Sequence, residues 1–152
     1  MVKPVEMAPV HHPPVPNGTW RSPARIDPFT VAIEDKVSYL LEANAAALAA
    51  GARFVNSQMF FLKDEKTYAN SLGTVTQQTI FRAQPGMTVT MVSADNRDFQ
   101  TRQSTDIQPK GLGYEHVLDA NLKQHAARWV AEAKQKLTAK PVDPGRYDLL
   151  LH

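Results

Sequence analysis

The sequence contains no cysteine, which excludes disulfides, thiolate catalysis and cysteine-ligated metal sites within its 152 residues. An excess of charge of one sign is also missing, because 17 Lys and Arg face 15 Asp and Glu. The surplus of +2 is spread along the chain, so the basic patch of a dedicated nucleic-acid protein is absent. No run of about 18 apolar residues occurs, which excludes a membrane-spanning helix of ordinary length.

The residues that are present are those of a folded domain. Hydrophobic residues make up 43% of the chain, a share typical of globular proteins rather than of disordered ones. A chain of this length buries roughly 70% of the surface that its unfolded form exposes, so one domain with a substantial core is expected.

Proline is concentrated at the N-terminus, where seven of the 11 prolines fall within the first 28 residues. Proline fixes its own φ and biases the preceding residue toward extended geometry. Residues 1–32 are therefore predicted to form an extended arm. Trp20, Ile26 and Phe29 are apolar enough to dock it, and packing along its own domain is favoured over binding a partner.

A helix is predicted over residues 33–50, with Glu34 and Asp35 in its first turn and Gly51 as its stop signal. Its predicted apolar face shares one side with Asn44 and consists of Ile33, Val37, Leu40, Leu41 and Leu48. The alanine-rich stretch 44–50 indicates close approach to a neighbouring element.

Residues 53–104 are rich in β-branched and aromatic residues and lack the helical period, which predicts strands. Turns are expected at Asp64-Glu65, Leu72-Gly73, Pro85-Gly86 and Asp95-Asn96. Short strands joined by short turns indicate an antiparallel meander of four to five strands.

A long second helix is predicted over residues 114–137, packed across the sheet, which makes the expected fold class α+β. The central α+β domain would span residues 33–140. The apolar run 147–151 is expected to form a buried strand, so residues 141–152 are interpreted as the truncated start of a following, catalytic domain.

No catalytic residue and no metal ligand can be assigned from the sequence, and the substrate-binding residues are unknown. His11 and His12 point to opposite sides of an extended segment, and His116 and His125 lie about 180° apart on the predicted helix. His152 stands alone, and none of the hydrolase or nucleotide-binding motifs HExxH, HExxxH, GxSxG, GxGxxG and GxxxxGK is present.

Two weaker patterns remain open. Gly111-Leu112-Gly113 precedes a helix and could hold an anion at the N-terminus of that helix, although the favoured interpretation is a flexible connector. A base-stacking sheet could be built from Arg82, Arg97 and Arg102 with Phe81 and Phe99, but strand aromatics usually belong to the core. Nucleic acid is therefore an unlikely partner.

Four stretches of the chain together resemble the TldD/PmbA family of zinc metallopeptidases, once described as modulators of DNA gyrase. They are Trp20-Arg21-Ser22-Pro23 with Ile26-Asp27-Pro28-Phe29, Glu34 to Asn44, Arg53 to Phe61, and Gly111-Leu112-Gly113-Tyr114-Glu115 followed by Pro144 to Leu149. The resemblance implies that the chain is the central domain of such an enzyme. The family's zinc-binding HExxxH would follow the strand that begins at Tyr147, and it is absent from this sequence.

The resemblance implies a cytoplasmic protein acting in proteolysis or peptide maturation. This domain would scaffold the catalytic domain and border a groove for an unfolded peptide, which an exposed sheet edge could bind through backbone hydrogen bonds. It also implies a homo- or heterodimer with a family member, and zinc in the full-length protein alone, so the fragment itself should be inactive. The alternative is a non-enzymatic peptide- or protein-interaction module, which a downstream HExxxH would exclude.

Overall fold

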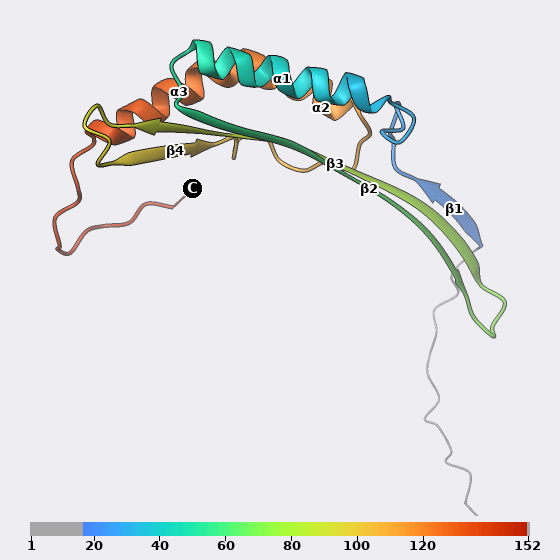
Figure 1. Ribbon diagram of the computed structural model, residues 1–152. Coiled ribbons are helices and arrows are strands. Elements are labelled where there is room, and N and C mark those ends of the chain that lie inside the picture. Colours follow the sequence, from blue (N-terminus) through green and yellow to red (C-terminus); the bar gives the residue numbers. More distant parts are fainter. Residues whose placement is uncertain (1–16, 152) are drawn as a thin grey trace, which may run out of the picture.

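The computed structural model describes residues 17–151, and Figure 1 shows the helices lying on one face of a long, curved sheet. The elements in chain order are β1 (Gly18–Arg21), α1 (Ile33–Ala49), β2 (Phe54–Ala69), β3 (Val75–Val92), β4 (Phe99–Gln103), α2 (Glu115–Ala120) and α3 (Leu122–Thr138). The α+β class is confirmed. None of the helices in the described residues is long and apolar enough to cross a membrane.

The sheet is mixed, so the predicted purely antiparallel meander is wrong in this respect. The strand order is β1-β3-β2, with β4 also pairing β3, and both β2 and β4 are antiparallel to β3. β1 instead runs parallel to β3, with Trp20 opposite Gln78. The parallel strand comes from the segment that was expected to be only an extended arm. The part of that arm before residue 17, with His11 and His12, lies outside the described residues.

β2 and β3 form one uninterrupted hairpin, so the predicted breaks at Asp64-Glu65 and Pro85-Gly86 are wrong. Asp64 and Glu65 pair with Ile80 and Thr79 in mid-strand, and β2 tolerates their charges because it lies at the edge of the sheet. Only the chain reversal near Gly73, which has a φ of +86°, occurs where it was expected in this part of the hairpin.

Pro85 is tolerated inside the central strand because its nitrogen faces a gap in the pairing. The neighbouring odd-numbered residues direct their backbone groups away from β2: Ala83 bonds Lys110, and Met87 bonds Ser104. Backbone direction alternates along a strand with a period of two, so Pro85 faces the same side. β1 has ended there and β4 has not begun, so no ladder bond is lost.

The long second helix is divided into α2 and α3 at Asn121, which the prediction of one continuous helix missed. Asn121 has φ +40° and ψ +60°, a left-handed conformation that asparagine tolerates better than most residues. Its side chain accepts a hydrogen bond from the backbone N–H of Gln124 and so caps α3.

The core lies between the helices and the covered face of the sheet. Trp129, Leu122 and Val89 are fully buried, and α1 approaches closely through Ala43 and Ala47, both with no exposed surface. The helix over residues 33–50 was predicted correctly, but only part of its predicted apolar face is buried, because Leu40 packs against the core and most of the other members do not. The aliphatic stripe that was expected to be buried remains largely exposed at Ile33, Val37, Leu41 and Leu48.

The predicted strand at residues 147–151 does not form. No strand is assigned to this run, and Leu149, Leu150 and Leu151 are each at least 80% exposed. An apolar run becomes a strand only when a neighbouring strand accepts its backbone hydrogen bonds. None of the described strands pairs with it.

Candidate functional site

Within residues 17–151 no helix or strand covers the face of the sheet opposite the helices, and this face carries several uncharged polar side chains. Side chains alternate across a strand, and the odd residues Val55 and Val89 belong to the core. The even residues therefore occupy the open face, where Asn56 stands opposite Thr88 and Gln58 opposite Gly86. Figure 1 shows this face on the inner side of the curve, away from α1 and α3.

A groove of about 280 Å³ lies on this open face, beside the part of β3 that pairs with neither β1 nor β4. Its wall includes the side chains of Asn56, Gln58, Gln84, Thr88, Gln103 and Gln108. No charged residue lines it. A carboxamide presents both donors and an acceptor, so the lining matches neutral amide groups better than ions. We name this feature the carboxamide groove.

Two buried serines complete the hydrogen bonding of β3 on either side of the gap. Ser104 accepts a hydrogen bond from the N–H of Met87 at 2.9 Å, and Ser22 accepts one from the N–H of Phe81 at 3.0 Å. Both serines are less than 10% exposed. Since an unpaired buried N–H is costly, these hydroxyls stabilise the long strand where no strand neighbours it.

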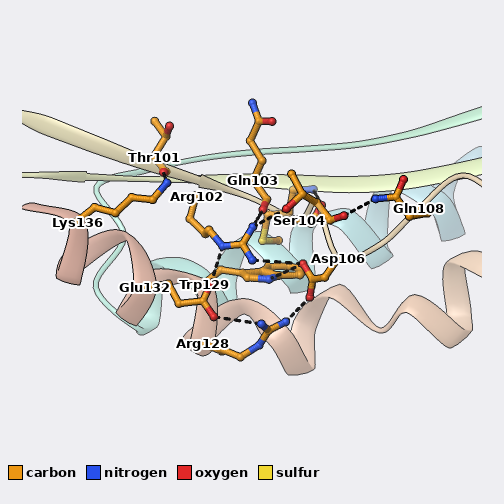
Figure 2. Close-up of polar contacts among 12 residues, drawn as sticks. Thr101, Arg102, Gln103, Ser104, Asp106, Gln108, Arg128, Trp129, Glu132 and Lys136 are labelled. Carbon is orange, nitrogen blue, oxygen red and sulfur yellow. Dashed lines mark hydrogen bonds and ion pairs between the residues drawn. The ribbon is translucent and has the colours of Figure 1, made fainter. Parts of the chain in front are cut away.

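A charged network fixes the loop that forms one side of the carboxamide groove, and Figure 2 shows Asp106 at its centre. Asp106 accepts hydrogen bonds from Trp129 Nε1 at 3.2 Å and from Arg128, and Arg102 lies 3.7 Å away. Arg102 and Arg128 also pair with Glu132 on α3. The loop after β4 is thereby tied to the helix beneath it.

The titration of this network follows from these contacts. Burial alone would raise the pKa of the Asp106 carboxyl, but hydrogen bonds from Arg128 and Trp129 outweigh burial and hold that pKa below its ordinary value. The hydrogen bond from Arg102 lowers the pKa of Glu132. Both acids therefore remain ionised near neutral pH, and they are structural partners of the arginines rather than proton donors.

A second polar contact joins the N-terminal segment to the start of α2. The buried Glu115 carboxylate, 3% exposed, accepts backbone N–H groups from Arg25, Ile26 and Gly113 at 3.0–3.1 Å. Burial would raise the pKa of Glu115, but these backbone hydrogen bonds outweigh it and lower that pKa. A Cβ at Gly113 would lie 2.0 Å from the carbonyl oxygen of Ile26, so only glycine fits here. We name this contact the Glu115 clamp.

The Glu115 clamp occupies the backbone donor that the predicted anion site at Gly111-Leu112-Gly113 would need. The N–H of Gly113 is already bonded to Glu115, and α2 is only six residues long. The connector thus packs closely against the chain before α1, at the carbonyl of Ile26. The glycines are evident in the sequence, but the Glu115 carboxylate that bonds the N–H of Gly113 is not.

The predicted base-stacking set is not brought together. Phe81 is buried on the helix side, where the Arg21 guanidinium lies 5.1 Å from its ring centre, whereas Arg82 follows it on the open face. Arg102 is engaged in the network around Asp106, and Arg97 lies in the turn before β4 beside Asp95. Phe99 alone of these aromatics is well exposed.

The histidines in the described residues have separate structural contacts. His116 Nε2 lies 2.9 Å from the carbonyl oxygen of Gln108, and the His125 ring lies 5.6 Å from that of Trp129. Within residues 17–151 no three histidine, aspartate or glutamate side chains gather as a metal site. His152 lies outside the described residues.

The roles of several site residues were missed because they depend on distant partners. Ser22 and Glu115 lie in stretches that carry the family resemblance, but those stretches show no role for either residue. Asp106, Ser104 and the carboxamides carry no local motif. Their positions follow from the gap beside Pro85, which cannot be read from spacing along the chain.

One comparison with known proteins gave a match. The family model described as the PmbA/TldA metallopeptidase central domain matches residues 26–140. No curated protein matches the chain, and no solved structure does.

Proposed function

Because the chain belongs to the PmbA/TldA metallopeptidase family and carries its central domain, we propose that it serves proteolysis or peptide maturation without performing the chemistry. Its role is to scaffold the catalytic domain and to border the path of an unfolded peptide. Residues 17–151 offer no ligand set that fits zinc, so the metal implied by the family would be held elsewhere in the full-length protein. We also propose a cytoplasmic location, with which a cysteine-free chain is compatible.

The observation that carries the peptide proposal is the carboxamide groove. A peptide backbone presents neutral N–H and C=O groups at regular intervals, and glutamine and asparagine side chains can bond both. The groove lacks charged residues, so it would not select substrate by charge. Its walls are fixed by the Asp106 network on one side and by the β2–β3 ladder on the other. A fixed site reduces the entropy lost on binding.

Peptide binding tests this proposal. The double variant Gln58→Leu/Gln84→Leu retains the approximate side-chain size but removes two carboxamides from the groove. Each lost hydrogen bond is worth about 0.5–1.5 kcal/mol, so the affinity for an uncharged, unstructured peptide of about ten residues should fall roughly tenfold. Fluorescence anisotropy of a labelled peptide measures the affinity.

Gln78→Leu is the matched control, because Gln78 lies on the same face of β3 outside the groove. This variant should bind the peptide as the unaltered chain does. Equal affinities for the double variant and the control would contradict the assignment of the groove. Absence of any binding at millimolar peptide would contradict a peptide-binding role for this domain.

A further inference from the structure

A second pocket lies on the open face of the sheet, beside the carboxamide groove. It has a volume of about 460 Å³, and Pro109 lines both cavities. Trp20 stands opposite Gln78 in the β1–β3 pairing and therefore shares the open face with the even residues of β3. Two of those even residues, Ile80 and Arg82, also line the pocket. We name this cavity the Trp20 pocket.

The walls of the Trp20 pocket are largely apolar. They include Trp20, Pro23, Ile80, Phe81 and Pro109. Trp20 is 54% exposed, so a ligand that covers its indole ring would remove a large apolar surface from water. A cavity of this volume and lining is suited to one large apolar side chain.

Two cations and no acid line the same pocket. Arg82 and Lys110 are both exposed, and neither forms an ion pair with a residue that the structure describes. Asp64, the acid in an even position of β2, stands opposite Ile80, but its carboxylate lies 3.7 Å from the Lys66 ammonium. The pocket therefore keeps positive charge beside an apolar wall, and this combination fits an anionic group joined to an apolar one.

A backbone acceptor faces the pocket as well. Odd-numbered residues of β3 direct their carbonyl groups away from β2, as Ala83 and Met87 show. β1 ends opposite Thr79, and Ser22 accepts only the N–H of Phe81. The Phe81 carbonyl thus points into the gap after β1, where no described strand donates a hydrogen bond to it. It is available to the N–H of a bound peptide.

We propose that the Trp20 pocket binds the C-terminal residue of the peptide whose backbone lies in the carboxamide groove. This inference rests on the proposed peptide-binding function of that groove. A C-terminal residue with a large apolar side chain presents that side chain, a carboxylate and a backbone N–H together. These groups match the apolar wall, the two cations and the Phe81 carbonyl. An aspartate or glutamate within a peptide presents a carboxylate without a large apolar group.

The spacing along β3 sets the length of peptide that fills both cavities. Ile80 lines the Trp20 pocket, and Gln84 lines the carboxamide groove four residues further along the strand. At about 3.3 Å per residue this separation is roughly 13 Å. An extended peptide advances by a similar amount per residue, so the residue beside Gln84 lies about four positions before its C-terminus. A dipeptide therefore fills only one of the two cavities.

Fluorescence anisotropy of a peptide of about ten residues, labelled at its N-terminus and without charged side chains, tests the pocket. The peptide that ends in phenylalanine with a free carboxylate should bind at least about tenfold more tightly than the same peptide with a C-terminal amide. Arg82→Gln should reduce this preference to less than about threefold. Trp20→Ala should weaken binding of the peptide that ends in phenylalanine more than binding of one that ends in alanine.

Arg97→Gln is the matched control for Arg82→Gln. It removes the same charge from a side chain that is 87% exposed in the turn before β4, outside the pocket. This variant should keep the full preference for the free carboxylate. An equal loss of preference in both variants would show an effect of net charge and would contradict the role assigned to Arg82.

The outcomes separate this inference from the proposed function. Suppose that the free acid and the amide bind equally while Gln58→Leu/Gln84→Leu still weakens binding. This result would overturn the Trp20 pocket and leave the carboxamide groove in place. Equally tight binding of an amidated peptide with an internal glutamate would also overturn it, because any carboxylate would then suffice. Absence of peptide binding would overturn both proposals.

Discussion

Replacing Glu115 by glutamine is the sharpest test of how the N-terminal segment is held. The carboxylate uses one oxygen for the N–H groups of Arg25 and Gly113 and the other for that of Ile26. A carboxamide has the same shape but only one acceptor atom. At best it retains two of these bonds and directs its own N–H₂ group at the third N–H.

The expected cost follows from this mismatch. A hydrogen bond to a charged group contributes about 1.5–3 kcal/mol, and a buried N–H left without an acceptor costs about 1–3 kcal/mol. Glu115→Gln should therefore lower the free energy of unfolding at pH 7 by about 3 kcal/mol. With a slope of about 1.5 kcal/mol/M, the urea midpoint would fall by roughly 2 M. Glu65→Gln, at an exposed carboxylate, is the control and should change stability by less than about 0.5 kcal/mol.

The pH dependence separates this mechanism from simple loss of packing. The pKa of Glu115 is lowered in the folded state, while an unfolded glutamate titrates near about 4.3. Its stabilisation is therefore complete well above the unfolded pKa and is lost as the pH falls through the folded pKa. The unaltered chain and Glu115→Gln should converge in stability at acid pH. A difference that is equally large at pH 7 and at pH 3 would refute the role assigned to the carboxylate.

Other expectations follow from the same contacts. Ser22→Ala and Ser104→Ala should each lower the free energy of unfolding by about 1–3 kcal/mol, because each leaves a buried β3 N–H without an acceptor, whereas the exposed Ser71→Ala should have little effect in urea titration. Trp129→Phe should cost about 2–3 kcal/mol by the same measurement, since it opens a cavity and removes the bond to Asp106. Elemental analysis after dialysis against zinc should find no stoichiometric metal, because the described residues present no ligand set; stoichiometric retention would contradict this.

The parts of the fold that were predictable are those governed by local signals. The helix that begins at Ile33 has acidic residues in its first turn and a glycine just past its end, and both signals act within a few residues. The change to strand-forming residues after Arg53 is equally local. The α+β class follows from these two patterns and needs no tertiary information.

The failures share one physical cause, which is that a distant partner reverses a local preference. In the sequence Pro85 predicts the end of a strand. It lies in mid-strand because the side to which its nitrogen points has no strand partner. In the sequence Asp64 predicts a turn, but it lies in an edge strand, where a charged side chain is tolerated. On α1, Ala43 and Ala47 are fully buried and Leu40 packs against the core, whereas Leu41 and Leu48 stay exposed, because close helix packing favours small side chains at the contact.

The same gap that makes Pro85 tolerable also produces the proposed peptide site. On the side away from β2, Pro85 offers no N–H donor to a neighbouring strand. β1 pairs with β3 before this position and β4 after it, and the serines and the loop after β4 complete the edge between them. That loop adds Gln108 to the groove beside Gln103 of β4, and the Asp106 network fixes it to α3. Restoring the donor with Pro85→Ala would thus leave an unpaired N–H at the gap without closing it, since no strand is available to fill it.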